Sequence, residues 1–453
     1  MPTSPDTSGF GGHPRGLATL FFTELWERFS YYGMRAILVL YMVAPVANGG
    51  LGFDTKTAAS IYGTYTMSVY LTTLPGGLIA DRLLGARLAV LIGGIIIACG
   101  HFSMVFTAPA FFYGGLVLIA AGTGLLKPNI STMVGSLYGE NDPRRDSGFS
   151  IFYMGINLGA VLAPLVCGYL AQGEGFKNFI TALGFNPATS WHWGFGAAGV
   201  GMTLGLIVYL AQRRRLGNIG QSLRPKKDAA TVAAPPPLTT TEWKRVGAIF
   251  VFFLFTILFW AAYEQKGASL NLFADRLVRT EAFGYKFPSS WLQSMTAFFV
   301  IILAPLFSML WVRMGERQPS SPVKFTLGLL FIGAGYVLMV PAAMLTASGK
   351  ISPLWLAGLY FLEVLGEMCL SPVGLSVVTK LAPAKVLGIM MGVWFLAAAL
   401  GNKLAGYLAG FFDANNAGVL TALYGGIAAG LLLSAAVLAA LTPAIRRMMG
   451  NVR

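Results

Sequence analysis

Four charged side chains interrupt one long apolar stretch near the start of the sequence. Glu24, Glu27, Arg28 and Arg35 lie between positions 17 and 44, together with Tyr31. At about 100° per residue, these five residues fall within an arc of about 100° on one helix face. One wall of such a helix is charged, and we therefore expect this face to line a polar cavity.

The hydrophobicity of the surrounding stretch determines where such charges can be. An ionised side chain at the centre of a bilayer costs roughly 2.5–3.5 kcal/mol on insertion scales, so these groups must face protein or water and neutralise one another. Snorkelling to the membrane interface is an alternative for a lysine, and it applies to Lys127 and Lys403. Further ionisable residues within or directly beside the long apolar runs include Lys127, Glu264, Lys266, Glu363, Glu367 and Lys403.

Composition identifies the class of protein. Of 453 residues, 55% are hydrophobic and only 11% are charged, too few polar side chains to cover a soluble globule. We predict an all-α membrane protein with twelve transmembrane helices in two six-helix bundles, because each run can span a hydrocarbon core of roughly 30 Å. The runs cover 17–44, 57–80, 88–107, 110–136, 148–171, 193–212, 244–265, 289–312, 324–346, 353–380, 386–411 and 420–442.

The distribution of Lys and Arg gives the orientation. With both termini in the cytoplasm, most of the 32 basic residues fall in cytoplasmic segments, as the positive-inside rule requires. The net charge of +14 therefore reflects membrane topology, and we expect a lipid bilayer and no nucleic acid as partner. The predicted organisation is a tail at 1–16, a bundle at 17–213, a linker at 214–242, a bundle at 243–442 and a tail at 443–453.

The two halves place their charges on corresponding helices. If the halves are structural repeats, the run at 244–265 corresponds to 17–44, and the run at 353–380 corresponds to 110–136. Ionisable residues occur in all four of these runs. This recurrence favours one shared central pathway over separate packing accidents. Asn157 is a lone amide in the fifth run, where hydrogen bonding between helices is the competing interpretation.

The link after the second run carries a family signature. Gly76-Gly77 permits a close helix contact, and Asp81 with Arg82 and Arg87 can form a charged latch at a cytoplasmic helix end. This pattern resembles the signature of the major facilitator superfamily, and it agrees with the predicted division into two sets of six helices.

A more specific resemblance comes from the first run. The pattern Glu24-x-x-Glu27-Arg28-Phe29-x-Tyr31-Tyr32-Gly33 resembles the first-helix motif of the proton-dependent oligopeptide transporters, the POT/PTR2 family. The resemblance implies import of di- and tripeptides by proton symport and alternating access. It extends to Phe152-Tyr153, Asn157-Leu158-Gly159, Glu264-Gln265, Gly366-Glu367, Leu370-Ser371-Pro372-Val373-Gly374-Leu375-Ser376, Trp394-Phe395-Leu396 and Gly401-Asn402.

The resemblance also assigns a substrate site. A zwitterionic peptide needs cations for its carboxylate and an anion for its amine, and we expect Arg35 and Lys127 in the first role and Glu367 in the second. The resemblance implies hydrogen bonds from three residues and pocket walls from two more. These are Tyr31, Tyr32 and Asn157, and then Tyr70 and Trp394.

Proton coupling requires carboxylates whose charge alters an ion pair. Protonating Glu264 would release Arg35 to hold the substrate carboxylate, and losing the proton would re-form the pair. The proton is then the coupling ion, and we expect no other cofactor and no metal. The switchable groups are Glu24, Glu27 and Arg28 with Lys127, and Glu264 with Arg35.

The sequence departs from the family pattern at three points. Thr296 follows Gln293-Ser294-Met295 where relatives usually carry Asn-Pro, which leaves open an amide contact with the peptide amine. Ala398 stands where some relatives place a serine. The linker at 214–242 is too short for the two extra helices that many bacterial relatives insert between the bundles.

Other functions share parts of this pattern with peptide symport. A related carrier of nitrate or a drug, and a peptide-sensing receptor without transport, are the alternatives. An enzyme is not expected, because His13, His101 and His192 are dispersed and form no nucleophile–base or metal pattern. We expect a monomer that crosses the plasma (inner) membrane several times, with both termini in the cytoplasm. The roles of Glu363, Lys266 and Lys403 stay open.

Overall fold

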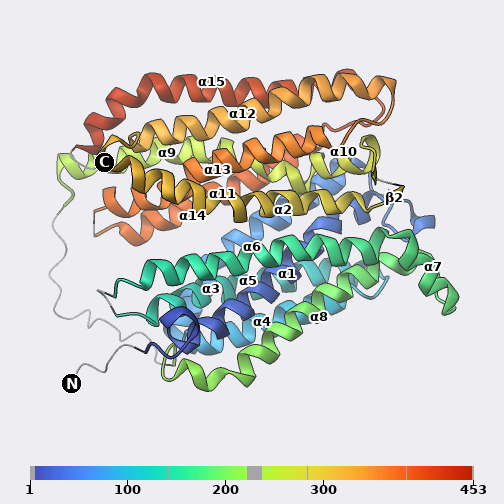
Figure 1. Cartoon of the computed structure of the whole chain (residues 1–453), viewed down its shortest axis with the longest axis horizontal. Coiled ribbons are helices and arrows are strands. Elements are labelled where there is room, and N and C mark those ends of the chain that lie inside the picture. Colours follow the sequence, from blue (N-terminus) through green and yellow to red (C-terminus); the bar gives the residue numbers. More distant parts are fainter. Residues whose placement is uncertain (1–5, 140–141, 222–236, 283, 384, 451–453) are drawn as a thin grey trace. The chain divides into compact units, whose positions relative to one another are not determined.

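The protein is built from long helices. The computed structural model describes residues 6–139, 142–221, 237–282, 284–383 and 385–450 (Figure 1). Within these ranges the strands are β1 (Glu281–Ala282) and β2 (Tyr285–Lys286), which pair antiparallel in a short hairpin. The predicted all-α class is therefore confirmed, with this hairpin as a small addition.

The chain divides into two compact units. Unit 1 comprises Met1–Phe53, Ser68–Pro225 and Glu281–Phe298, and unit 2 comprises Asp54–Met67, Lys226–Thr280 and Phe299–Arg453. The helix α2 (Thr55–Leu71) begins in unit 2 and ends in unit 1, whereas α11 (Ser294–Met314) begins in unit 1 and ends in unit 2. Of the predicted linker at 214–242, residues 222–236 lie outside the described residues, as do 1–5 and 451–453 of the predicted tails.

The remaining helices belong to one unit each. Those of unit 1 are α1 (Arg15–Val43), α3 (Thr73–Ile79), α4 (Ala86–Ser103), α5 (Pro109–Ser136), α6 (Arg145–Gln172), α7 (Glu174–Ala182) and α8 (Ser190–Ala211). Those of unit 2 are α9 (Thr240–Tyr263), α10 (Ser269–Leu277), α12 (Ser321–Leu345), α13 (Leu354–Leu381), α14 (Leu387–Ala409) and α15 (Ala417–Met449). Short helical turns are η1 (Phe10–Gly12), η2 (Val46–Asn48), η3 (Ala80–Leu84), η4 (Pro187–Thr189), η5 (Arg213–Leu216), η6 (Glu264–Gly267), η7 (Ser289–Gln293), η8 (Gly315–Arg317) and η9 (Thr346–Ser348).

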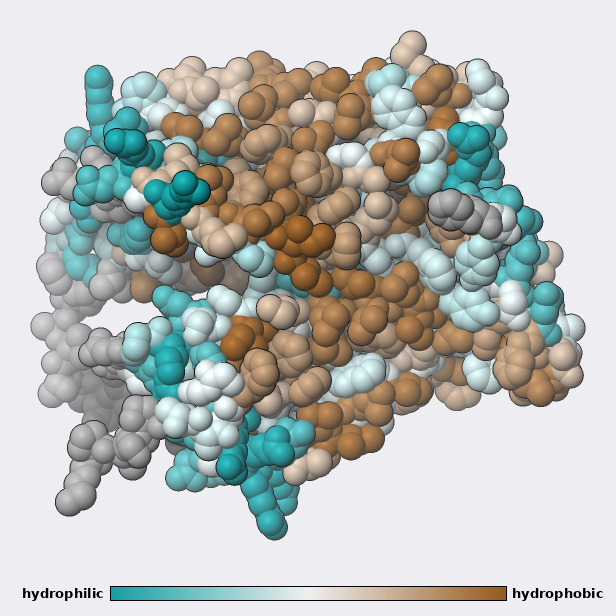
Figure 2. Space-filling view, viewed as in Figure 1, coloured by the Kyte–Doolittle hydropathy of each residue, from teal (hydrophilic) through white to brown (hydrophobic). Residues whose placement is uncertain are grey.

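Ten helical segments of the described chain are long and apolar enough to cross a membrane, and they overlap ten of the twelve predicted spans. The other two predicted spans, 17–44 and 57–80, contain α1 and the pair α2 and α3. Glu24, Glu27 and Arg28 interrupt the apolar character of α1, and α2 has 17 residues. On the face shown in Figure 2, apolar side chains gather over the middle of the helices and hydrophilic ones near their ends. The count of twelve stays a prediction.

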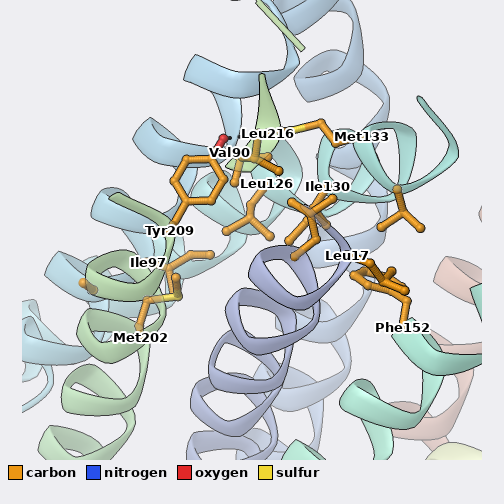
Figure 3. Close-up of a cluster of buried hydrophobic side chains, with 13 residues drawn as sticks. Leu17, Val90, Ile97, Leu126, Ile130, Met133, Phe152, Met202, Tyr209 and Leu216 are labelled. Carbon is orange, nitrogen blue, oxygen red and sulfur yellow. Dashed lines mark hydrogen bonds between the residues drawn. The ribbon is translucent and has the colours of Figure 1, made fainter. Parts of the chain in front are cut away.

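An apolar cluster fixes the first turns of α1 in unit 1. Leu17 and Leu20 of α1 are buried against side chains of four other helices (Figure 3). The partners include Val90 and Ile97 of α4, Leu126 and Ile130 of α5, Phe152 of α6, and Met202 and Tyr209 of α8. Because well-packed interiors resist displacement, this cluster sets the rotation of α1 and therefore the direction of its charged face.

The helix α9 is followed by a break within unit 2. It ends at Tyr263, η6 follows, and Ala268 adopts φ −121° and ψ −104° before α10 begins. The carbonyl groups at the break are held by side chains: the Tyr336 hydroxyl donates to Ala262 O at 2.8 Å, and Gln265 Nε2 donates to Ala261 O at 3.2 Å. A helix interruption at membrane depth is tolerated when its backbone groups are satisfied in this way.

Arg87, one of the arginines of the latch predicted after the second run, contacts backbone carbonyls. Arg87 Nη1 donates to Gly217 O at 3.0 Å, and Nη2 donates to the carbonyl oxygen of Arg213. The Arg87 backbone N–H donates to Gly220 O at 2.9 Å. This arginine therefore ties the start of α4 to the segment that follows α8, and backbone carbonyls serve as acceptors.

The glycine pair Gly76-Gly77 in α3 offers a matched test of close packing in unit 1. A Cβ atom on Gly76 would overlap the carbonyl group of Gly124 in α5, whereas a Cβ atom on Gly77 would meet nothing within 4 Å. We expect Gly76→Ala to lower the free energy of unfolding by about 1–3 kcal/mol, the usual cost of overpacking. We expect Gly77→Ala to leave it unchanged or raise it, because alanine favours helix. Thermal unfolding of the detergent-solubilised protein measures both, and equal melting temperatures would contradict this packing.

Candidate functional site

The charged face of α1 holds one arginine between two carboxylates. Arg28 Nε lies 3.1 Å from Glu24 Oε1, one helical turn away, and it also forms a salt bridge with Glu27 Oε2. All three side chains are buried in unit 1. The helix α6 comes close here because Gly159 has no side chain, and a Cβ atom there would lie 3.1 Å from Arg28 Cβ. The predicted charged face therefore forms a compact ion triad.

The hydrogen bonds of this triad are incomplete. Glu24 Oε2, Glu27 Oε1 and Arg28 Nη2 are buried and have no hydrogen-bond partner among the described residues. If both carboxylates are ionised, their two negative charges exceed the single positive charge of Arg28. Lys127 of α5 lies close enough to Glu24 to attract it electrostatically. A buried ion pair with unsatisfied atoms carries a large desolvation cost, so a change of protonation or partner can relieve part of that cost.

Lys127 lies against an aromatic ring inside unit 1. Its Nζ atom is 4.5 Å from the centre of the Tyr70 ring, and the side chain is half-buried. Residue 128 is proline, yet α5 continues as one helix to Ser136. The ring face attracts the ammonium group without neutralising it. The structure thus places Tyr70, which the resemblance assigns to the pocket wall, directly beside the expected carboxylate-binding lysine.

Tyr31 lies between the two arginines of α1. The Arg28 and Arg35 guanidinium carbons are 5.2 and 5.9 Å from the centre of its ring, and the Tyr32 ring is 5.2 Å away in an edge-to-face contact. These four side chains line one continuous side of the helix. Asn157 on α6 donates from Nδ2 to Tyr153 O at 2.9 Å, a bond within its own helix and not between helices.

In unit 2, Glu367 of α13 accepts a hydrogen bond from the Tyr263 hydroxyl. Lys266 of η6 places its Nζ 3.5 Å from the centre of the Tyr263 ring, and it attracts Glu367 electrostatically. The sequence indicated Glu367 but missed Tyr263. In the sequence, only its position next to Glu264 pointed to Tyr263. The contact between Tyr263 and Glu367 joins two helices, and the spacing of residues along the chain does not predict it.

The other predicted residues of unit 2 have distinct surroundings. Trp394 of α14 packs closely on Gly374 of α13, with its ring 6.2 Å from that of Phe325. Glu264 is buried at the start of the break. Its expected partner Arg35 belongs to unit 1, so this pair stays a prediction.

The structure describes the surroundings of Thr296 and Ala398, where the sequence departs from the family pattern, and of Lys403. The Thr296 hydroxyl is buried in unit 1 and has no hydrogen-bond partner among the described residues. Ala398 is buried, and its carbonyl accepts from Asn402 Nδ2 at 2.9 Å. Lys403, for which snorkelling is one interpretation, donates to Thr64 Oγ1 of α2 at 2.6 Å within unit 2. Across the described ranges, no group of three or more His, Cys, Asp or Glu side chains is arranged to hold a metal ion.

Comparison with known proteins identifies the family. The model of the POT family matches residues 87–234 and 237–423. The peptide transporter YePEPT of Yersinia enterocolitica is 38% identical over 100% of this chain and 99% of its own length. The di-/tripeptide transporter of Lactococcus lactis subsp. cremoris is 36% identical, with 98% of each chain covered.

Solved structures agree with these matches. A peptide transporter POT in complex with alafosfalin superposes with a TM-score of 0.88 at 40% identity, covering 98% of each chain. A POT family transporter in complex with 5-aminolevulinic acid gives a TM-score of 0.85 at 32% identity, covering 97% of this chain and 98% of that one. The resemblance found in the motif of α1 is therefore confirmed, and this chain belongs to the POT family of membrane transporters.

Proposed function

We propose that this protein is a proton-coupled symporter that imports di- and tripeptides by alternating access. The observation that carries the proposal is the buried triad Glu24–Arg28–Glu27, with unsatisfied atoms and Lys127 nearby. Such a cluster can take up a proton and redistribute its ion pairs without leaving a charge stranded. Neither an inert packing role nor simple anion binding needs two carboxylates in this position.

Binding of a zwitterionic peptide follows from the charges available. Arg35 and Lys127 would hold the carboxylate of the peptide, and Glu367 would hold its amine. Tyr31, Tyr32, Tyr70, Asn157 and Trp394 would supply hydrogen bonds and walls. The contact between Tyr263 and Glu367 orients the carboxylate that would receive the amine. Pocket walls made of aromatic and small side chains leave room for varied peptide side chains, as a transporter of many peptides requires.

Coupling would use Glu264 as the switch. In its protonated form this residue would release Arg35 for the substrate, and after losing the proton it would compete with the substrate for Arg35. One proton moving through 100 mV supplies roughly 2.3 kcal/mol. At about 1.4 kcal/mol per decade, this energy sustains a concentration ratio of about fifty-fold.

The names of the relatives support a peptide substrate. Two relatives are a peptide transporter and a di-/tripeptide transporter, and solved POT structures hold alafosfalin or 5-aminolevulinic acid. The remaining parts of the proposal are a monomer in the inner membrane, with both termini in the cytoplasm, no catalytic activity and no cofactor besides the proton. A carrier of nitrate or a drug, or a receptor that senses peptides, would be revealed by the experiment below.

The variant Glu264→Gln tests the role of Glu264 in proton coupling. We expect the intact protein in proteoliposomes to accumulate labelled dialanine when an inward proton gradient is imposed, and the variant to lose this accumulation. Counterflow exchange of dialanine should survive in the variant, because glutamine resembles the protonated carboxyl and leaves the binding site intact. A matched control is Glu174→Gln, since Glu174 is exposed on α7.

Each outcome of this experiment has a distinct meaning. An intact protein that neither moves nor binds a dipeptide would refute the peptide assignment and favour another solute. Binding of dialanine without any transport would favour the receptor. Gradient-driven accumulation by Glu264→Gln equal to that of the intact protein would remove Glu264 from the coupling mechanism.

The variant Glu367→Gln tests the role of Glu367 in binding the peptide amine. Loss of one charge-assisted hydrogen bond costs about 1.5–3 kcal/mol, so the affinity for dialanine should fall roughly ten- to hundred-fold. N-acetyl-dialanine has no ammonium group, so its affinity should change little between the intact protein and the variant. Competition against a labelled dipeptide measures both affinities. An equal loss of affinity for both ligands would show that Glu367 does not bind the peptide amine.

A further inference from the structure

A second carboxyl of unit 2 lies one helical turn before Glu367. Glu363 of α13 is fully buried, with 0% of its surface exposed. Neither of its oxygen atoms has a hydrogen-bond partner among the described residues. An ionised carboxylate in such surroundings is costly, because burial removes its water and no donor replaces it. Neither the proposed peptide contacts nor the proposed coupling pairs use this residue.

The groups that face Glu363 come from several elements of unit 2. Lys266 of η6 and Glu367 of α13 act on it electrostatically, and so do Tyr336 of α12 and Tyr360 of α13. The Tyr336 hydroxyl is already committed to Ala262 O, and the Tyr360 hydroxyl has no partner in the described chain. The Tyr424 ring of α15 is 6.2 Å from that of Tyr336, and its hydroxyl donates to Ser269 O. None of these hydroxyl groups donates to the carboxyl group of Glu363.

The charges that act on Glu363 do not balance if both Glu363 and Glu367 are ionised. Lys266 brings one positive charge, whereas Glu363 and Glu367 would bring two negative ones. Glu367 has a hydrogen-bond donor in Tyr263, and Glu363 has none. Two nearby carboxylates that share one counter-ion retain a proton, which resides on the one whose ionised form is less stabilised.

We propose that Glu363 is a second proton-binding site, linked to Glu367 by competition for Lys266. While Lys266 balances Glu367, Glu363 keeps its proton. When Glu367 is neutralised, Lys266 balances Glu363, and the proton leaves Glu363 for water. The inference rests on the geometry of unit 2, so it holds whichever solute the protein carries.

Infrared spectroscopy of the full-length protein at neutral pH tests this link, because the carbonyl stretch of a protonated carboxyl group is distinct from that of a carboxylate. We expect Glu363→Gln to lose the intensity of one protonated carboxyl. We expect Glu367→Gln to lose the same intensity, since Lys266 then stabilises ionised Glu363. Lys266→Gln should gain the intensity of one further carboxyl, because neither glutamate then has a cation.

Lys403→Gln is the matched control, because Lys403 is a cation of the same unit that contacts Thr64 and is not among the groups acting on Glu363. It should leave the carboxyl band unchanged. An unchanged band in Glu363→Gln would overturn the site itself. A band lost in Glu363→Gln but unchanged in Glu367→Gln and Lys266→Gln would overturn the link and indicate an isolated buried acid. The last two variants decide the question even if Glu363→Gln fails to fold.

Discussion

The attraction between Arg28 and two buried carboxylates is the constraint around which unit 1 is arranged. A guanidinium group cannot be placed among apolar helices unless anions lie beside it, and Glu24 and Glu27 meet that need from the same helix. The neighbouring backbone must then stay close enough to exclude lipid, which explains the glycine that α6 places beside Arg28. The cluster at the start of α1 serves the same end by fixing the rotation of the helix.

Aromatic rings accompany the cations in both units. Arg28 lies over Tyr31, Lys127 over Tyr70, and Lys266 over Tyr263. A ring face attracts a cation more weakly than a carboxylate does, and an aromatic side chain does not change its charge near neutral pH. Such a contact therefore holds the cation in position without determining which carboxylate it pairs with. This arrangement suits groups whose partners must change during a transport cycle.

Local spacing explains what the sequence could predict. Glu24 and Arg28 are four residues apart on one helix, so their contact follows from helix geometry alone. The contact between Tyr263 and Glu367 joins residues 104 positions apart, and no local pattern specifies it. The break after Tyr263 was also missed, because no proline marks it and side chains from distant helices stabilise it. Similarly, the sequence showed the pair Gly76-Gly77, but only the packing of α5 distinguishes the two residues.

The first part of α2 packs against α14, which is synthesised much later. Within unit 2, Gly63 approaches Gly406 so closely that a Cβ atom would lie 2.8 Å from the Gly406 Cα, and Thr64 accepts from Lys403, 339 positions later. The ribosome therefore completes almost the whole chain before this part of α2 meets its partner. Until α14 is inserted, this surface must be sheltered by lipid, by another helix or by the translocon. This surface consists of small and hydroxyl-bearing residues, namely Ala59, Gly63 and Thr64, and such residues are compatible with a temporary lipid or helix neighbour.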